Sequence, residues 1–285
     1  MQNAFKDSLK KLNDLNLVNF SNFSQRGIEK ESLRVNDSEI SNSDHPKVLG
    51  SALTNPFITT DFSEALLEFI TRKSSTVEKA LDDLKIILTY THQNIDDVIW
   101  PGSVPCSIRD ESKIRIANYG TSNSGKLKEL YRIGLSYRYG SMMQCVSGIH
   151  YNFSLNEDFF KKWQGSKENF QSFQNEKYLN LIRNFRKNAW LLLYLFGASP
   201  VVPNTFLTDR KNFLKPLNNK DSFLENATCL RMSELGYMSE AQDDLNIAYN
   251  TLDEYISDLR NALTKKYEPY EEIGLKKDNQ HIQIN

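Results

Sequence analysis

The sequence predicts an α+β fold in which strands and helices are distributed along one domain. Polar and apolar residues alternate around residues 26–35 and 142–155, as in strands with one buried face. Elsewhere apolar residues recur three and four positions apart, which is typical of amphipathic helices. Because no repeat, low-complexity tract or linker interrupts the chain, we expect residues 1–285 to form a single domain.

Composition and charge argue against several classes of protein. A net charge of −1 leaves no basic surface for nucleic acid or an anionic membrane. No apolar run approaches the ~20 residues of a membrane span, and residues 1–7 lack the apolar core of a signal peptide. Three widely spaced cysteines, Cys106, Cys145 and Cys229, predict neither a disulfide framework nor a zinc site. We therefore expect a cytoplasmic protein.

The first half of the chain begins with a helix predicted over residues 4–20, before the strand at 26–35. Residues 36–46 are polar and turn-rich, which indicates a hairpin or a loop. A segment around Asp61 and Glu68 follows. Ser75 then begins a long helix that ends near Asp97, because its apolar residues lie at helical spacing.

The second half is predicted to alternate loops, helices and one long strand. In chain order we expect a loop over 119–125, a helix over 126–139, a strand over 142–155, a helix over 176–196, an irregular excursion over 206–227 and a last helix over 239–265. Residues 281–285 begin a strand alternation without a turn or partner after it. This ending indicates a chain that stops inside a domain.

Two glutamates on the first strand suggest a metal site. Side chains two apart on a strand point the same way, so Glu29 and Glu31 share a face with Leu33 and Val35. Two like charges on a half-buried face repel each other, and either a cation compensates them or one takes up a proton. Hard ions such as Mg²⁺ prefer oxygen ligands. An ordinary solvated strand face is the alternative.

A second acidic segment is less clear. At helical spacing Asp61, Glu64 and Glu68 share one exposed face. As a strand, which the β-branched residues at 58–60 favour, Glu64 and Glu68 point inward with Leu66 and need a partner. The pattern leaves both interpretations open.

Three further features have a functional and a structural interpretation. His150 lies mid-strand with Asn152 and Ser154 on its face, where a lone histidine is more often a hydrogen-bonded core residue than a ligand. The glycine-containing loop at 119–125 either cradles a phosphate or simply connects two elements. Arg231 either forks a carboxylate or phosphate or forms a surface ion pair.

Together these stretches resemble the glutamate–cysteine ligase family of the proteobacterial type, which makes γ-glutamylcysteine, the first intermediate of glutathione. The resemblance spans nearly the whole chain in family order. It rests on RGIEKESLR (26–34), LGSALT (49–54), ITTDF (58–62), LLEFIT (66–71), YGTSN (119–123), GIHYNFS (148–154), YLFGASP (194–200) and LRMSELGY (230–237).

The resemblance implies a role for each matching residue. The Mg²⁺-binding carboxylates of the family match Glu29, Glu31, Asp61 and Glu68. The residues that line the cysteine pocket match Phe62 and Tyr237, and polar residues of the catalytic and substrate site match His150 and Arg231. The implied fold is glutamine-synthetase-like: a curved, mainly antiparallel sheet with the metals on its concave face and helices packed outside.

The implied reaction uses two or more Mg²⁺ ions, with glutamate, cysteine and ATP as substrates. ATP phosphorylates the γ-carboxylate of glutamate, and the cysteine amine displaces phosphate from the acyl phosphate. Family members continue past residue 285, where they supply further strands, another metal-binding glutamate and an arginine. The resemblance therefore implies an N-terminal fragment whose partner is the C-terminal remainder of the enzyme.

Three rival functions stay open at this point. One is another ATP-dependent carboxylate–amine ligase of the same fold that uses a different amine. A second is a metal-dependent phosphohydrolase, for which His150 is the visible candidate base. The third is an inactive chain that acts as a scaffold for an intact ligase.

Overall fold

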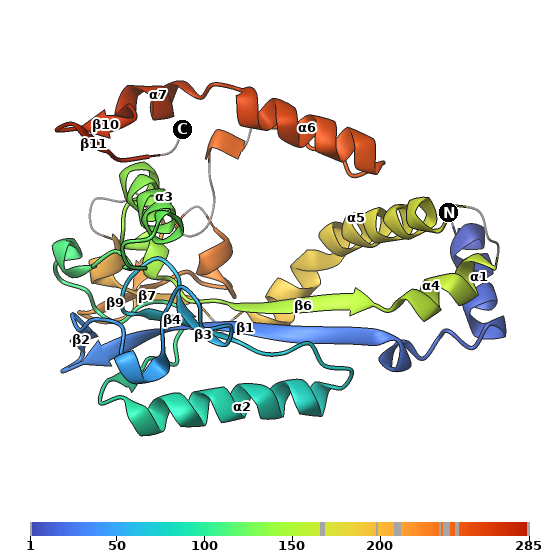
Figure 1. Ribbon diagram of the computed structural model, residues 1–285, viewed down its shortest axis with the longest axis horizontal. Helices are drawn as coiled ribbons and strands as arrows, with labels where there is room; N and C mark the ends of the chain where they lie inside the picture. The colour runs from blue at the N-terminus through green and yellow to red at the C-terminus, as the bar shows by residue number, and fades with distance from the viewer. Residues whose placement is uncertain are drawn as a thin grey trace.

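A computed structural model describes residues 2–165, 169–197, 199–207, 212–233, 235, 240–242 and 245–283. It confirms the α+β prediction, with antiparallel strands and helices packed outside them (Figure 1). The main sheet contains β1 (Ser24–Asn36), β2 (Glu39–Ile40), β3 (Ile58–Thr60), β4 (Leu66–Ile70), β5 (Val98–Ile99) and β6 (Ile149–Leu155). A second sheet has the order β7 (Val201–Pro203), β9 (Asp221–Phe223), β8 (Lys215–Pro216).

Strand β1 organises the main sheet because its 13 residues pair with four other strands. Its residues 24–30 pair with β6 and its residues 29–33 pair with β4, and β3 extends the sheet beyond β4. Its far end pairs with β2 in a hairpin and with β5. All these pairings are antiparallel. The hairpin confirms one of the two interpretations of residues 36–46.

Helix α2 (Val77–Asn94) covers one face of the sheet (Figure 1). Its apolar stripe packs on the side chains that β3, β4 and β5 direct to that face, namely Ile58, Leu67, Phe69 and Ile99. The predicted helix is confirmed, but its cap is Thr76 rather than Ser75. The Thr76 hydroxyl accepts the N–H of Lys79, and this bond satisfies one of the free donors of the first turn.

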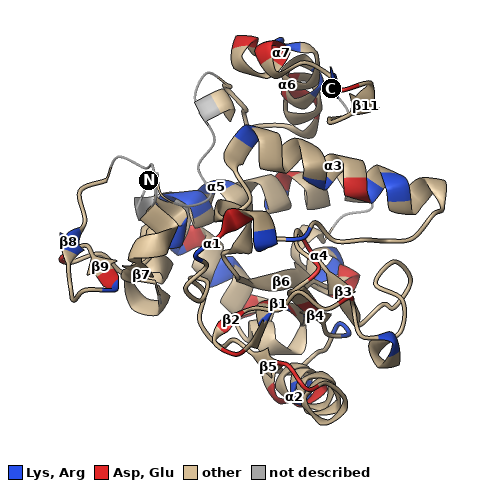
Figure 2. Ribbon diagram, turned by 90° about the vertical axis from the view of Figure 1, so that its left-hand side faces the viewer, with Lys and Arg blue, Asp and Glu red and all other residues tan. Residues whose placement is uncertain are grey.

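Helix α3 (Asn123–Tyr139) lies on the opposite side of the sheet from α2, as Figure 2 shows from the side. It begins three residues before the predicted 126, because the Ser122 hydroxyl accepts the N–H of Gly125 and caps it. Beyond it lie α6 (Leu252–Thr264), α7 (Glu268–Ile273) and the hairpin of β10 (Lys276–Lys277) and β11 (Gln280–His281). The side chain of Gln283 packs against α3 at Gly134.

A third group of helices packs at the start of β1. These are α1 (Gln2–Asp14), α4 (Glu157–Gln164) and α5 (Phe170–Phe196). Phe159 and Phe160 of α4 are buried there, and the aromatic ring of Trp163 meets Phe159 edge-on. The cluster therefore ties the amino-terminal helix to the middle of the chain.

Several predicted boundaries were wrong. Helix α1 ends at Asp14 rather than residue 20, since Asn16 has a positive φ of 54°. The predicted strand at 142–155 begins only at Ile149, after a short 3₁₀ turn. Helix α5 begins at Phe170, six residues earlier than predicted. The predicted last helix at 239–265 is helical as α6 only from Leu252, where Thr251 caps it.

Two other findings concern the chain as a whole. The predicted irregular region at 206–227 begins in a 3₁₀ helix (Asn204–Leu207) and contains the short strands β8 and β9. In the part of the chain that the structure describes, no helix is both long and apolar enough to cross a membrane.

Candidate metal centre on the main sheet

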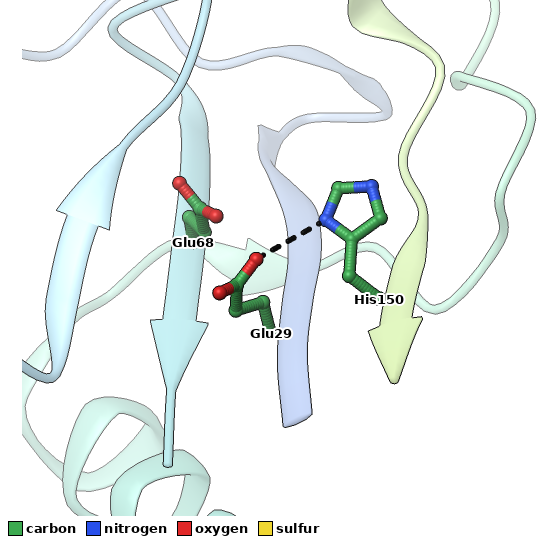
Figure 3. A group of neighbouring side chains, drawn as sticks. All are labelled: Glu29, Glu68 and His150. Atoms are coloured by element: carbon green, nitrogen blue, oxygen red, sulfur yellow. Dashed lines mark ion pairs between the residues drawn. The ribbon is translucent and has the colours of Figure 1, made fainter. Parts of the chain in front are cut away.

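The strand register collects polar side chains on the face of the sheet opposite α2. Residue pairs directly across an antiparallel ladder point to the same face. Glu31 of β1 lies opposite Glu68 of β4, and Glu29 of β1 lies opposite His150 of β6. Since Glu29 and Glu31 are two apart, all four side chains project from one face. Figure 3 shows three of them, Glu29, Glu68 and His150, on three neighbouring strands.

Three of these side chains offer a set of ligand atoms for a cation. One atom each from Glu29, Glu68 and His150 lies within 4.8 Å of the other two. His150 Nδ1 is 3.4 Å from Glu29 Oε2 (Figure 3), and Asn152 Nδ2 donates to Glu29 Oε1 over 2.9 Å. Carboxylate and imidazole ligands at this separation suit a divalent ion. Each of the three side chains projects from a strand of the main sheet.

Glu31 is almost fully buried and has two partners of its own. Its Oε2 accepts the backbone N–H of Gly148 at 2.6 Å and lies 3.5 Å from Nη1 of Arg231. Burial raises the pKa of Glu31 and the Asp61 charge adds to the rise, while Arg231 and the Gly148 N–H oppose it. Arg231 also donates to the carbonyl of Val146 over 3.1 Å.

Gly148 explains how Arg231 approaches this carboxylate. A Cβ atom at position 148 would lie 2.5 Å from Nη1 of Arg231 and 2.6 Å from its Cζ. The guanidinium therefore occupies the space that any larger residue would fill. The arginine predicted from the resemblance is thus held beside Glu31 on the acidic face.

Glu68 carries the clearest electrostatic signal of the site. The pKa of Glu68 is raised from 4.5 to about 7, mainly by burial and in addition by the nearby charges of Asp61, Glu31 and Glu29. Arg132 opposes the rise only in part. Glu68 therefore lies among three other carboxylates with little positive charge beside it. A bound divalent cation would supply that charge, and the oxygen ligands present suit such an ion.

Asp61 reaches the same site from a loop rather than a strand. It follows Thr60, the last residue of β3, and precedes β4. Its Oδ1 lies 3.3 Å from Nη2 of Arg132, and its carbonyl accepts from Arg132 Nε and from the Tyr119 hydroxyl. The Arg132 guanidinium also stacks 4.7 Å from the centroid of the Tyr119 ring.

Arg132 was missed by sequence reasoning. A signal was available, because Arg132 precedes the packed Leu135 by three residues and so shares its face of α3. An arginine on the inward face of an amphipathic helix needs a carboxylate or carbonyl partner. Asp61 and the Tyr119 ring are those partners.

Glu64 does not join the acidic face. The strand interpretation that paired it with Glu68 was wrong, because β4 begins only at Leu66. The Glu64 carboxylate is buried and accepts the backbone N–H of His45 at 2.9 Å and of Asn118 at 2.8 Å. It joins two loops and so has a structural role. The helical alternative was wrong as well, since no helix covers residues 61–68.

The structure describes one of the two residues expected to line a cysteine pocket. Phe62 is fully buried in the main core, where it packs with Leu33, Leu66 and Cys145. Tyr237 lies outside the described residues. The assignment of both residues to a substrate pocket stays a prediction.

The loop at 119–125 uses backbone donors internally. The N–H of Gly120 binds the Asn118 side chain at 2.7 Å, and the N–H of Gly125 binds the Ser122 hydroxyl at 3.1 Å. Gly120 has a φ of +84°, a conformation that favours glycine. These contacts shape the entry into α3.

Comparison with known proteins identifies the relatives of this chain. A model of the family described as Glutamate-cysteine ligase matches residues 9–285. The glutamate–cysteine ligase of Hahella chejuensis is 47% identical over 266 residues, which cover 91% of this chain and 51% of the relative. That of a Janthinobacterium species is 44% identical over 290 residues, covering 100% and 55%. The chain spans about half the length of the curated relatives it matches.

Two solved structures share the fold. The crystal structure of glutamate–cysteine ligase from Francisella tularensis in complex with AMP matches with a TM-score of 0.85 and 41% identity, over 92% of this chain and 52% of that one. A bifunctional glutathione synthetase from Pasteurella multocida matches with a TM-score of 0.73 and 29% identity, over 91% of this chain and 32% of that one.

Proposed function

Since this chain belongs to the glutamate–cysteine ligase family, we propose that it supplies the metal-binding face of an active site that joins glutamate to cysteine with ATP. The observation that carries the proposal is the trio of Glu29, Glu68 and His150, whose ligand atoms lie within 4.8 Å of one another on the sheet. The product is γ-glutamylcysteine, the first intermediate of glutathione. The single catalytic domain expected over residues 1–285 is part of this proposal.

Each acidic residue has a place in the proposed metal centre. Glu29, Glu68 and His150 would hold one Mg²⁺, and Glu31 and Asp61, whose charges act on Glu68, would add negative charge for a second. When bound, the ions neutralise phosphate oxygens of ATP and the incoming γ-carboxylate. The AMP found in the Francisella tularensis relative supports ATP as the co-substrate.

The two arginines of the site have different proposed roles. Arg231 is held on the acidic face by Glu31 and by the Val146 carbonyl. A guanidinium held in this way pairs with a substrate carboxylate or a transferring phosphate. Phe62 and Tyr237 are proposed to contact the cysteine side chain. Arg132 holds the Asp61 loop at the edge of the metal centre.

The order of events follows from the chemistry of amide formation. The γ-carboxylate of glutamate attacks the γ-phosphorus of ATP, and ADP leaves. The cysteine amine then attacks the acyl carbon and phosphate leaves, while the amine loses a proton. The residues of the chain contribute by holding both substrates in place and by matching negative charge.

The test restores the length of the relatives. Residues 1–285 are fused to the second half of the Hahella chejuensis relative, and phosphate release is followed with ATP and Mg²⁺. We expect release that depends on both glutamate and cysteine, and a loss of about 10–100-fold in the Glu29→Gln or Glu31→Gln variant. Residues 1–285 alone are expected to make no measurable γ-glutamylcysteine.

Three results contradict the proposal or its metal-ligand assignment. ATP hydrolysis that needs no amine identifies a phosphohydrolase. Turnover with an amine other than cysteine identifies a different carboxylate–amine ligase. If the turnover of Glu29→Gln stays within about threefold of that of the unchanged fusion, Glu29 is not a metal ligand. Loss of a metal ligand or its support lowers activity by about 10–100-fold.

A further inference from the structure

A cavity of about 850 Å³ lies at the far end of β1, away from the metal centre. Its lining comes from the end of β1, from β5, from residues 102–107 and from β7 of the second sheet. Val35 in this lining lies four residues along β1 from Glu31, or about 13 Å at the rise of a strand. The cavity is therefore a separate site, and its volume suits a small organic molecule.

The floor of the cavity is the main hydrophobic core. Val35, Cys106 and Val202 line the cavity and are buried members of that core. Leu33, which lies between Val35 and Glu31 on the same face of β1, is fully buried there as well. A molecule in the cavity would thus rest on apolar side chains rather than among the carboxylates of the metal centre.

Trp100 is held in the lining by two hydrogen bonds. Its indole N–H donates to the carbonyl of Val104 at 2.9 Å, and its backbone N–H donates to the carbonyl of Leu33 at 2.8 Å. Since the indole N–H is used within the protein, the ring offers a ligand apolar contact and a π face rather than a donor. Val98, which is 62% exposed on β5, adds a further apolar side chain to the wall.

Negative charge is in excess around this apolar floor. The lining contains three aspartates, Asp37, Asp96 and Asp221, and one lysine, Lys220. Asp37 and Asp96 are exposed, so a charged group bound beside them would stay in contact with water. A hydrated metal ion gains nothing from the apolar floor, because it needs oxygen ligands on several sides. The combination instead selects a molecule with an apolar body and a positively charged end.

Two hydrogen bonds connect one wall of the cavity to the metal centre. The Ser103 hydroxyl donates to the carbonyl of Ser147 at 2.7 Å, and the N–H of Ser147 donates to the carbonyl of Ser103 at 2.7 Å. The next residue is Gly148, whose N–H donates to Glu31 at 2.6 Å. A displacement of Ser103 is therefore passed through one residue to the group that holds the Glu31 carboxylate.

A second connection runs through the opposite wall. Pro200 lines the cavity, and the carbonyl of its neighbour Ser199 accepts the N–H of Leu230 at 2.8 Å. The Ser199 hydroxyl accepts the N–H of Arg231 at 3.4 Å. Because Arg231 lies 3.5 Å from Glu31, both walls act on the same ion pair.

We propose that the cavity binds a small organic cation with an apolar body, and that its binding shifts the pair of Arg231 and Glu31. The core residues would bury the body of the ligand, and the aspartates would match its charge. The two hydrogen-bonded walls would pass the change to the ion pair. Binding in the cavity is independent of the proposed ligase function, whereas any effect on turnover rests on it.

Phenethylamine is the probe, because it joins a phenyl ring to an ammonium group at neutral pH. Hydrocinnamate, which has a similar body and a negative charge, is the control ligand. Nuclear magnetic resonance of the isotope-labelled 285-residue chain follows the indole N–H of Trp100, identified by its loss in Trp100→Phe. We expect phenethylamine to move this signal in a saturable manner and hydrocinnamate to leave it in place. The fusion to the second half of the Hahella chejuensis relative should bind phenethylamine with the same affinity.

Changes to the lining locate the binding. Asp37→Asn combined with Asp96→Asn removes two charges and should weaken phenethylamine binding about fivefold. Asp82→Asn on the exposed face of α2 is the matched control and should leave the affinity unchanged. Val98→Trp fills the cavity from an exposed position and should abolish binding, while an unchanged melting temperature shows that the fold is kept.

The amide signal of Gly148 reports the connection to the ion pair, since this N–H donates to Glu31. Saturating phenethylamine should move the signal in the unchanged chain. The movement, relative to that of the Trp100 signal, should be smaller in Ser103→Ala, which lacks one of the two bonds to Ser147. These readouts need neither a metal ion nor turnover, so their failure is distinguishable from failure of the proposed function.

Four results overturn the inference. One is the absence of saturable movement of the Trp100 signal. A second is binding that does not depend on charge, seen as equal affinity for hydrocinnamate or as full affinity after loss of Asp37 and Asp96. A third is binding to the 285-residue chain but not to the fusion, because polypeptide would then fill the cavity. The fourth is a Gly148 signal that stays in place at saturation, which removes the connection to the ion pair.

Discussion

Glu31 and Glu68 lie directly opposite each other on β1 and β4, with both carboxylates on the face of the sheet that α2 does not cover. Arg231 approaches Glu31 to 3.5 Å, whereas no arginine or lysine among the described residues forms an ion pair with Glu68. Burial and the surrounding carboxylates raise the pKa of Glu68 to about 7. The pair therefore holds more negative charge than the protein itself compensates, which is the physical basis of the proposed metal centre.

The first prediction concerns stability as a function of pH. The pKa of Glu68 is about 7 in the folded chain, above its ordinary value of 4.5. The folded state therefore binds this proton more tightly than the unfolded state, and stability is lost as the pH rises through 7. We expect Glu68→Gln, measured in EDTA, to raise the melting temperature relative to the unchanged chain more at pH 8 than at pH 5.

The control for this measurement is Glu272→Gln on the exposed face of α7, which removes the same charge. Its effect on the melting temperature should be small and the same at both pH values. An equal effect of Glu68→Gln at pH 5 and pH 8 would show that the carboxyl does not titrate between them.

The second prediction tests the contact between Gly148 and Arg231. In Gly148→Ala the new Cβ atom would meet the guanidinium at 2.5 Å and displace it from Glu31. Urea unfolding should show a loss of about 1–3 kcal/mol, because the buried carboxylate loses a partner. Gly27→Ala is the matched control on β1, where the Cβ would meet its nearest atom at an ordinary 3.7 Å.

A double variant separates this contact from general strain. If displacement of Arg231 is the cause, Gly148→Ala and Arg231→Ala together should cost less than the sum of the two single changes. Additive costs would mean that Gly148→Ala destabilises the chain for another reason.

The third prediction concerns a buried ion pair at the other end of β1. Arg34 is fully buried and its Nη1 lies 2.6 Å from Asp97 Oδ2. Asp97→Ala leaves that charge without its carboxylate, so the free energy of unfolding should fall by about 3–5 kcal/mol. Asp44→Ala breaks the solvent-exposed pair with Arg115 and should lower the free energy of unfolding far less, because water and salt screen that pair. Equal losses in the two variants would contradict this account.

The alternation of the two central strands was predictable from the sequence. Period-two patterning placed Glu29 with Glu31 and His150 with Asn152 before any pairing was known. The register that brings these sets together was not predictable, because it depends on which strands pair and at which residues. The position of Glu68 opposite Glu31 depends on that register and could not be read from the sequence.

The predictions that failed did so for local or tertiary reasons. For Glu64 a helix and a strand were both left open, with the β-branched residues 58–60 favouring the strand, but its carboxylate binds two loop N–H groups and the strand begins later. The last helix was predicted to begin too early, since apolar spacing continues before the Thr251 cap. Arg132 was missed because its partners, Asp61 and Tyr119, are distant in the sequence.

The central claim is that Glu29, Glu68 and His150 bind a divalent cation, and Mn²⁺ binding to residues 1–285 tests it most directly. Electron paramagnetic resonance of added Mn²⁺ measures the free ion, and Mg²⁺ is then added as a competitor. We expect saturable binding that Mg²⁺ displaces, weakened about 10–100-fold in both Glu29→Gln and Glu68→Gln, and unchanged in Glu272→Gln. Binding of the same affinity in all three variants, or none in the unchanged chain, would contradict the account.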